Sequence, residues 1–434
     1  MTNSVGVATD VTGRPDPRSI RPLFIIWSGQ VCSWFGSELT QFALVWWLTR
    51  TTGSASVLAF ATTMAVLPRI FVGPFAGALV DRWNRRLVLI VSDSVIALAT
   101  IMLAVMYGLG VVQTWHIYAL LFIRAMGGAF HLPAITASTS MLVPEKHLSR
   151  VAGLNQAMLG TIAIVAPPLG AALLEIVLVQ GILAIDVATA TLAIGPLLFI
   201  AVPQPVQHER SEAGAGRGSF LSSVLVDLGA GLRFIWGFKA LRIMIGMIMV
   251  LNVLGWPLVT LVPILITSHF GGGAVEFGWF QSALGAGGIL GGLILGAWGG
   301  FKRRVVTMLL ALIVDGVAMT VLGLIPASAL PVAASAWFLV GVMSSTINGT
   351  SMAILQATVP PALQGRVFAV QWSCVTAMSP VGLAVAGPLA DAFGPPIWYV
   401  IAGVSHAAIG LLALFVPTLI RIEDRAVEKA ATDP

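Results

Sequence analysis

The sequence predicts an all-α membrane protein with twelve transmembrane helices arranged as two six-helix bundles. Charged residues make up only 9% of the 434 residues and hydrophobic residues 57%, whereas soluble domains carry about 25% charged residues. The apolar residues come in long blocks, and a membrane helix needs about 20 of them in a row. Short motifs also recur between the two halves of the chain, which indicates a duplicated bundle.

Twelve blocks are long and apolar enough to be predicted transmembrane helices. They cover residues 22–48, 55–80, 87–107, 114–141, 152–175, 180–201, 240–267, 276–299, 305–325, 332–357, 366–390 and 396–418. The first twenty residues are polar and lead directly into a full-length span, so no cleavable signal peptide is expected.

The blocks divide the chain into five regions. A polar segment rich in proline, glycine and charge follows residue 201 and reads as a linker. After it, apolar residues recur at helical spacing between 220 and 235, which predicts an amphipathic helix on the membrane surface. The expected regions are an N-terminal tail (1–20), a first bundle (21–201), a linker with an amphipathic helix (202–239), a second bundle (240–418) and a C-terminal tail (419–434).

Positive charge predicts the orientation. All but three of the 23 lysines and arginines lie in the tails and the even-numbered loops; the exceptions are Arg50, Arg69 and Arg124. The positive-inside rule therefore places both termini in the cytoplasm of a multi-pass protein of the inner or plasma membrane. The net charge of +5 then reflects topology and not a nucleic-acid partner.

Two motifs recur between the halves. "VPEKHLSRV" (143–151) returns as "VPPALQGRV" (359–367), and "GALVDRWNRR" (77–86) is echoed by "GAWGGFKRR" (296–304). Parallel repeats of this kind are typical of major facilitator transporters.

The loop motif resembles the signature between spans 2 and 3 of the major facilitator superfamily, with Asn84 where the family usually has glycine. "IWSGQVCSWFGSELTQFAL", "TGSASVLA", "LLFIRAMGGAF" and "VPEKHLSRVAGLNQ" together resemble its macrolide-efflux and enterobactin-exporter branch, and the similarity covers nearly all of 22–418. The resemblance implies that Asp81 and Arg82 latch the outward-facing state. The alternative is a basic loop that only anchors the topology. The predicted conformational latch comprises Gly77, Asp81, Arg82, Arg85 and Arg86; in the second-half echo Gly300 stands near the place of the acid.

Charges within the spans are costly, about 2.5–3.5 kcal/mol each on insertion scales, so each is a functional candidate. Glu38 in span 1 and Arg124 in span 4 both fall about 5 Å to the outer side of the midplane, at 1.5 Å per residue. Arg124 also matches the family's span 4 motif, which continues with Gly127 and Gly128. We expect Glu38 and Arg124 to pair and to couple transport to protons. A static pair that fixes helix packing, or no contact, are the alternatives.

The other intramembrane charges receive separate interpretations. Arg69 and Asp93 are expected to be inner-leaflet neighbours that form a structural or gate-linked pair. His131 follows Arg124 on the same helical face, either as part of a proton relay or as a packing residue. Asp186 is interpreted as structural, reaching the outer interface, and Asp315 has no assigned role. The predicted proton-coupling set is Glu38, Arg124, Asp93 and His131.

A mostly apolar cavity with a few polar groups suits a bulky amphipathic ligand. The resemblance implies that spans 1, 4, 7 and 10 line the cavity, although aromatic core packing would give a similar pattern. The candidate substrate-contacting residues are Trp34, Gln41, Phe130, Asn252, Trp256 and Asn348.

No catalytic, nucleotide-binding or metal-ligand motif occurs in the sequence, so neither an enzyme nor a cofactor or metal site is expected. The predicted function is secondary active export of amphipathic small molecules, drug- or macrolide-like, by proton antiport with alternating access. A siderophore exporter of the same fold and a transporter-like sensor that does not translocate its ligand are the alternatives. The expected partners are a small-molecule substrate, protons and the lipid bilayer, with a monomer as the assembly.

Overall fold

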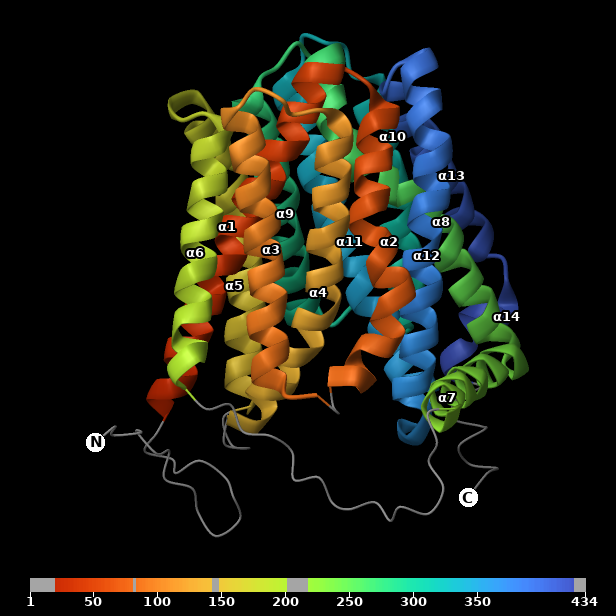
Figure 1. Cartoon of the computed structure of the whole chain (residues 1–434). Helices are drawn as coiled ribbons and strands as arrows, with labels where there is room; N and C mark the ends of the chain where they lie inside the picture. The colour runs from red at the N-terminus through yellow and green to blue at the C-terminus, as the bar shows by residue number, and fades with distance from the viewer. Residues whose placement is uncertain (1–19, 81–82, 143–147, 201–217, 425–434) are drawn as a thin grey trace. The chain divides into compact units, whose positions relative to one another are not determined.

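The computed structural model describes residues 20–80, 83–142, 148–200 and 218–424, which are almost entirely helical and contain no strand (Figure 1). The helices are α1 (Ile20–Thr52), α2 (Ala55–Val80), α3 (Arg85–Gly108), α4 (Thr114–Leu142), α5 (Leu148–Ile176), α6 (Val179–Phe199), α7 (Gly218–Gly237), α8 (Lys239–Ile264), the π-helix η2 (Leu265–His269), α9 (Ala274–Trp298), α10 (Arg304–Leu324), α11 (Leu330–Thr358), α12 (Pro361–Phe393), α13 (Pro396–Ala413) and α14 (Pro417–Ile420).

Eleven helices of the described part are long and apolar enough to cross a membrane. Two long helices are not among these eleven, α1 and α7; α1 carries Gln30, Ser37, Glu38 and Gln41 within its apolar sequence, which lowers its hydropathy. An all-α membrane protein is therefore confirmed, and the helix order is consistent with twelve spans in two bundles. The amphipathic segment after the linker forms the separate helix α7.

Contacts between Cα atoms divide the chain into two compact units. Unit 1 comprises residues 1–47 and 64–213, and unit 2 comprises 48–63 and 214–434. The end of α1 and the beginning of α2 thus group with the second half of the chain, whereas the sequence places them in the first bundle. Asp391 of α12 contacts the beginning of α2 and is described below.

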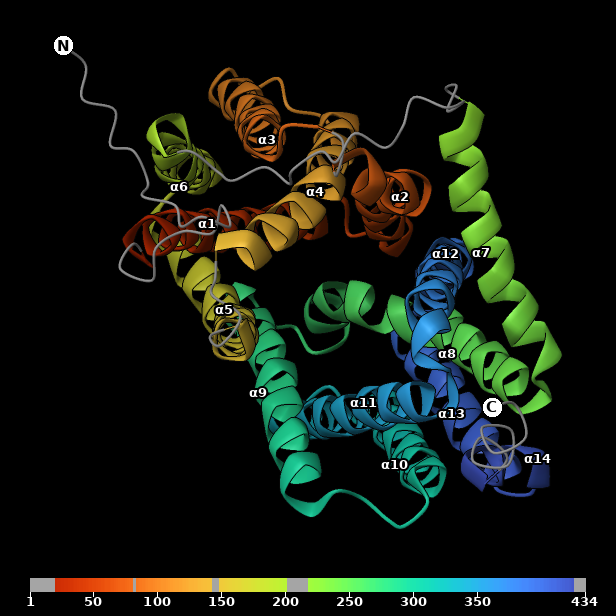
Figure 2. The same cartoon turned by 90° about the horizontal axis from the view of Figure 1, so that it is seen from below.

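Within unit 1, α3 packs between α4 and α6, and α5 also contacts α6 (Figure 2). Small residues make close approach possible. A Cβ atom on Gly127 of α4 would lie 2.9 Å from Ile96 Cγ1 and 3.2 Å from the carbonyl oxygen of Ser92 on α3. Packing through small residues is how membrane helices commonly associate, because lipid supplies no hydrophobic drive between them.

Within unit 2, α10 packs against α11 and α13, α9 against α11, and α12 against α7 and α8. A hydrophobic core joins these helices, apart from α9, near their ends and includes Met244, Leu309, Leu355 and Val367. Ile235 of α7 is 4% exposed and belongs to the same core, so the apolar face of this amphipathic helix is anchored against unit 2.

Candidate functional site

Arg124 of α4 lies in a buried hydrogen-bond network formed by four helices of unit 1. Its NH1 group pairs with Oδ2 of Asp186 on α6 and donates to Thr100 Oγ1 on α3 over 2.7 Å. Thr100 donates in turn to Asp186 Oδ2 at 3.2 Å, and Ser37 of α1 donates to Oδ1 at 3.0 Å. The side chains of Arg124 and Asp186 are 11% and 2% exposed. The carboxylate therefore has an ion-pair partner and hydrogen bonds on both oxygens, as a buried charge requires.

Gly36 brings α1 close enough to take part. A Cβ atom at this position would lie 3.2 Å from Asp186 Cα and 3.2 Å from Thr189 Cβ, both on α6. Because Gly36 has no side chain, the neighbouring Ser37 hydroxyl reaches the Asp186 carboxylate.

A second polar group is formed by Asp93 of α3, Gln30 of α1 and His131 of α4. Gln30 Nε2 donates to Asp93 Oδ2 at 3.1 Å, and His131 Nε2 lies 3.3 Å from Asp93 Oδ1 and 2.8 Å from Gln30 Oε1. Both neighbours of His131 Nε2 are oxygen atoms, so a proton on this nitrogen would face two acceptors.

The two polar groups repeat with one spacing on three helices. Gln30 and Ser37 on α1, Asp93 and Thr100 on α3, and Arg124 and His131 on α4 are each seven residues apart. Seven residues are two helical turns, or about 10 Å, so one helical face of each helix contributes to both layers. Asp186 of α6 contributes to the Arg124 layer, and its charge also acts on Asp93.

The structure changes several pairings expected from the sequence. Among the described residues, the ion-pair partner of Arg124 is Asp186 and not Glu38, and Asp93 contacts His131 rather than Arg69. The interpretation of Asp186 as reaching the interface is wrong, because it is 2% exposed. Depth along a span, used for these pairings, does not tell which face of the helix a side chain occupies.

Glu38 is exposed and makes no hydrogen bond or ion pair within the described part of the chain. Arg124 and Arg69 are the cations that act on it electrostatically. Arg69 lies beside α4, since a Cβ atom on Gly128 would be 3.8 Å from its NH2 group. Glu38 is thus a carboxylate with exposed surface in otherwise dense protein surroundings, near two cations, of which Arg124 is held by another acid.

Asp315 of α10 in unit 2 is also buried, at 2% exposure, and its Oδ1 atom has no hydrogen-bond partner among the described residues.

The residues expected to contact substrate differ in their surroundings. Trp34 and Trp256 are 38% and 45% exposed, and Gln41 is partly buried. Phe130 stacks on Trp83, with ring centroids 5.9 Å apart, and packs against a hydrophobic cluster of unit 1. The amides of Asn252 and Asn348 donate to carbonyl oxygens of their own helices, those of Ile248 and Ser344.

The loop after α2 is only partly described, because Asp81 and Arg82 lie outside the described residues; Gly77 is within α2. Asn84, which stands where the family usually has glycine, is the N-cap of α3 and accepts the Leu87 N–H group at 3.2 Å. Arg85 donates to the Ala137 carbonyl oxygen of α4, and Arg86 NH2 donates to the Leu198 carbonyl oxygen near the end of α6 at 2.6 Å. These two arginines therefore bind helix carbonyls within unit 1.

The corresponding loop of unit 2 has a structural reason to lack the acid. Gly300 adopts φ = 81°, a left-handed conformation that disfavours residues with a side chain. This loop binds the helical segment near residue 424. The Arg303 side chain pairs with Asp424 at 3.3 Å, and the backbone N–H group of Arg304 donates to the Glu423 carboxylate at 3.0 Å.

No group of histidine, cysteine, aspartate or glutamate residues in the described chain could hold a metal ion. The sequence analysis missed Asp391, which bonds to the start of α2. The sequence shows it only as an acidic residue near the end of a span, and many acidic residues at such positions are simply exposed to water.

Comparison with known proteins identifies the family. The family model of the Major Facilitator Superfamily matches residues 26–383. Macrolide efflux protein A of Streptococcus pyogenes is 28% identical over 389 residues, covering 90% of this chain and 94% of that protein. Multidrug efflux pump Tap of Mycolicibacterium fortuitum is 31% identical over 408 residues, covering 92% and 96%.

Solved transporter structures share the fold at low identity. A bacterial homologue of the human lysosomal transporter Spinster has a TM-score of 0.70 at 13% identity, covering 94% of this chain and 98% of that one. The nucleoside transporter NupG has a TM-score of 0.68 at 12% identity, covering 91% and 99%. Family, fold and membrane-spanning helices agree with the interpretation as a transporter and not an enzyme. The chain belongs to the Major Facilitator Superfamily, whose members are multi-pass membrane transporters of small molecules.

Proposed function

We propose that this transporter exports amphipathic small molecules, drug- or macrolide-like, by proton antiport with alternating access. The names of its relatives support this proposal, since macrolide efflux protein A and multidrug efflux pump Tap both align along at least 90% of this chain. The proposal includes a location in the cell membrane as a monomer, with both termini in the cytoplasm. Trp34, Gln41 and Trp256 are the proposed substrate contacts, because they are at least partly accessible.

The observation that carries the proton-coupling part is the contrast between Glu38 and Asp186. Asp186 is buried and bound by Arg124, Thr100 and Ser37, so its charge is fully compensated. Glu38 is accessible and has no direct partner among the described residues. A carboxylate inside a membrane span is costly when it remains charged and unpaired, and protonation removes that cost.

Arg124 has an indirect role in this proposal. Because Asp186 and Thr100 hold its guanidinium group in place, its charge acts on Glu38 from a fixed position. A cationic or polar substrate near Glu38 changes the same electrostatic balance. Proton binding and substrate binding then depend on each other, and linkage makes that dependence reciprocal.

The energy of one proton is sufficient for useful export. Moving one charge down about 100 mV supplies roughly 2.3 kcal/mol. At about 1.4 kcal/mol per factor of ten, this supports a substrate gradient of about fifty-fold.

The test is substrate-dependent proton release by the purified protein, followed by uptake into liposomes with an imposed pH gradient, using a macrolide and other amphipathic compounds. Glu38→Gln is expected to bind substrate without pH dependence and to stop proton-driven transport. Glu175→Gln is the control, because Glu175 is an exposed acid at the end of α5, and it should transport normally.

Two results would contradict the proposal. If Glu38→Gln moves substrate against a gradient with normal pH dependence, Glu38 is not the coupling site, and Asp93 and Asp315 become the candidates. If the unmodified protein binds the compounds but never translocates them, the chain is a ligand sensor and not an exporter.

A further inference from the structure

Asp391, near the C-terminal end of α12, binds the first turn of α2. Its Oδ1 atom accepts the Ala55 N–H group at 2.6 Å, and its Oδ2 atom accepts the Ser56 N–H group at 3.0 Å and the Ser54 hydroxyl at 3.0 Å. All four residues belong to unit 2. One carboxylate thus makes three hydrogen bonds to three consecutive residues, Ser54 and the first two of α2, more than 300 positions away in the sequence.

The contact satisfies a requirement of the helix. The first N–H groups of an α-helix have no partner within it. Ser54, the residue before α2, accepts the Val57 N–H group through its hydroxyl oxygen at 3.3 Å, which is ordinary N-capping. Asp391 serves the two preceding N–H groups. A carboxylate at this end of a helix also interacts favourably with the helix dipole, so the contact is charge-assisted.

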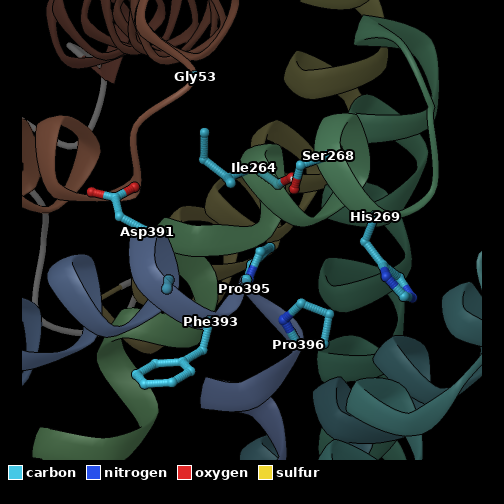
Figure 3. A pocket seen from close by; sticks show the side chains of 10 residues that line it. Gly53, Ile264, Ser268, His269, Asp391, Phe393, Pro395 and Pro396 are labelled. Atoms are coloured by element: carbon cyan, nitrogen blue, oxygen red, sulfur yellow. The ribbon is translucent and has the colours of Figure 1, made fainter.

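Helix α12 packs closely against α2 at this contact, and a cavity lies on the other side of Asp391. A Cβ atom on Gly387, one turn before Asp391, would lie 2.9 Å from Ser56 Cα, so the missing side chain lets α12 approach α2. On its other side, Asp391 borders a cavity of about 370 Å³ that is also lined by Ile264, Ser268 and Phe393 (Figure 3). The carboxylate is exposed, so water can replace its partners when the helices part.

We propose that Asp391 and the segment Ser54–Ser56 form a clasp, and that this clasp holds the corner between α1 and α2 on α12, at the end of these helices that the charge pattern places outside. α1 and α2 continue from the clasp into unit 1, on either side of residues 48–63. Any movement that separates this pair of helices from α12 has to break all three hydrogen bonds. With alternating access, the clasp opens and re-forms in each transport cycle, and its strength sets how often the cavity beside Asp391 is accessible. This inference rests on the alternating access proposed above.

The test measures opening without requiring transport. Ile264 lines the cavity and is only 4% exposed, so Ile264→Cys is the reporter, in a background with Cys32→Ser and Cys374→Ser. The purified protein in nanodiscs, without substrate, is treated with a hydrophilic maleimide. Asp391→Asn is expected to raise the labelling rate about tenfold, which corresponds to about 1.4 kcal/mol.

Ala55→Pro is a second, independent variant. It removes the N–H group that Oδ1 accepts, and proline fits the first position of a helix, so α2 should remain intact. It is expected to raise labelling at least threefold.

Glu276→Gln is the matched control. Glu276 Oε2 accepts the Gly273 N–H group at 2.7 Å in the first turn of its own helix, α9, so this variant loses a helix cap without releasing a second helix. Its labelling rate should equal that of the reporter protein. The clasp is refuted if Asp391→Asn leaves labelling unchanged, or if Glu276→Gln accelerates it equally. If the unmodified protein transports none of the compounds, the export proposal is refuted instead. The labelling comparison would still decide about the clasp.

Discussion

Arg124 of α4 and Asp186 of α6 form an ion pair inside unit 1, with side chains 11% and 2% exposed. Thr100 bonds to both partners and Ser37 bonds to the carboxylate, so four helices meet at this pair. The pair answers why a permanent cation occurs in the middle of an apolar helix. The charge of Arg124 is compensated by Asp186 within the protein. It also acts electrostatically on Glu38, with which it forms no ion pair.

Removing the charge of Asp186 should strongly destabilise the protein. Asp186→Asn leaves Arg124 buried without a counter-ion, and breaking a buried pair in this way costs about 3–5 kcal/mol. The measurement is the free energy of unfolding in detergent. Asp424→Asn is the control, because Asp424 and its partner Arg303 are 57% and 47% exposed, and such exposed pairs contribute about 0–1 kcal/mol. Equal losses for the two variants would show that the Arg124–Asp186 pair is not structural.

Adding one methyl group to Gly36 should disrupt the contact between α1 and α6. The new Cβ atom would meet Asp186 Cα and Thr189 Cβ at 3.2 Å, and overpacking of this kind costs about 1–3 kcal/mol. Gly195→Ala, in α6, has no atom within 4 Å of the new Cβ and should stabilise by about 0.4–1 kcal/mol. Thermal unfolding of both variants gives the comparison. The interpretation fails if Gly36→Ala is as stable as Gly195→Ala.

His131 should be replaceable by another donor. Because its Nε2 atom lies 2.8 Å from Gln30 Oε1 and 3.3 Å from Asp93 Oδ1, His131→Gln can preserve one of these contacts and is expected to keep stability and the pH profile of transport. His131→Leu leaves the buried Asp93 with one partner fewer and should cost about 1–3 kcal/mol. A pH profile that changes in His131→Gln while stability is retained would instead support a proton relay.

The loop after α2 should separate into a switching part and an anchoring part. Asp81→Asn is expected to abolish transport while folding and substrate binding persist, because the resemblance to the family implies a contact specific to one state. Arg86→Gln loses donors to the carbonyl groups of Leu197 and Leu198 and should lower stability by about 1–3 kcal/mol. Substrate binding, transport and unfolding are measured for each variant. Full transport by Asp81→Asn would rule out the latch.

Labelling of single cysteines checks the orientation. Thr51, in the last turn of α1, and Lys302, in the loop between α9 and α10, are both exposed and lie at opposite ends of the spans. Both variants are made in a protein without its native cysteines. In intact cells, Thr51→Cys should react with an impermeant thiol reagent, and Lys302→Cys should react only after the membrane is opened. The reverse pattern would invert the topology predicted by the positive-inside rule.

The sequence by itself determined the type of the membrane helices and the family, and its count of twelve spans is consistent with the structure. Hydropathy along a chain directly reports burial in lipid, because each span must be apolar over a fixed length. It also identified the intramembrane charges, because these are rare and costly enough to be noticed singly. The seven-residue spacing of Arg124 and His131 was visible as a shared helical face.

The tertiary structure alone decided which charges meet. Arg124 pairs with Asp186, and Asp93 contacts Gln30 and His131. Matching depth had instead favoured Glu38 as the partner of Arg124 and Arg69 as the partner of Asp93. Depth fixes a residue's position along one axis only. The rotation of each helix about its own axis depends on packing at positions such as Gly36 and Gly127, where a missing side chain admits the neighbouring helix. The Asp391 clasp could not be predicted from the sequence either. The Asp391 carboxylate accepts backbone N–H groups, which every non-proline residue carries and no motif distinguishes.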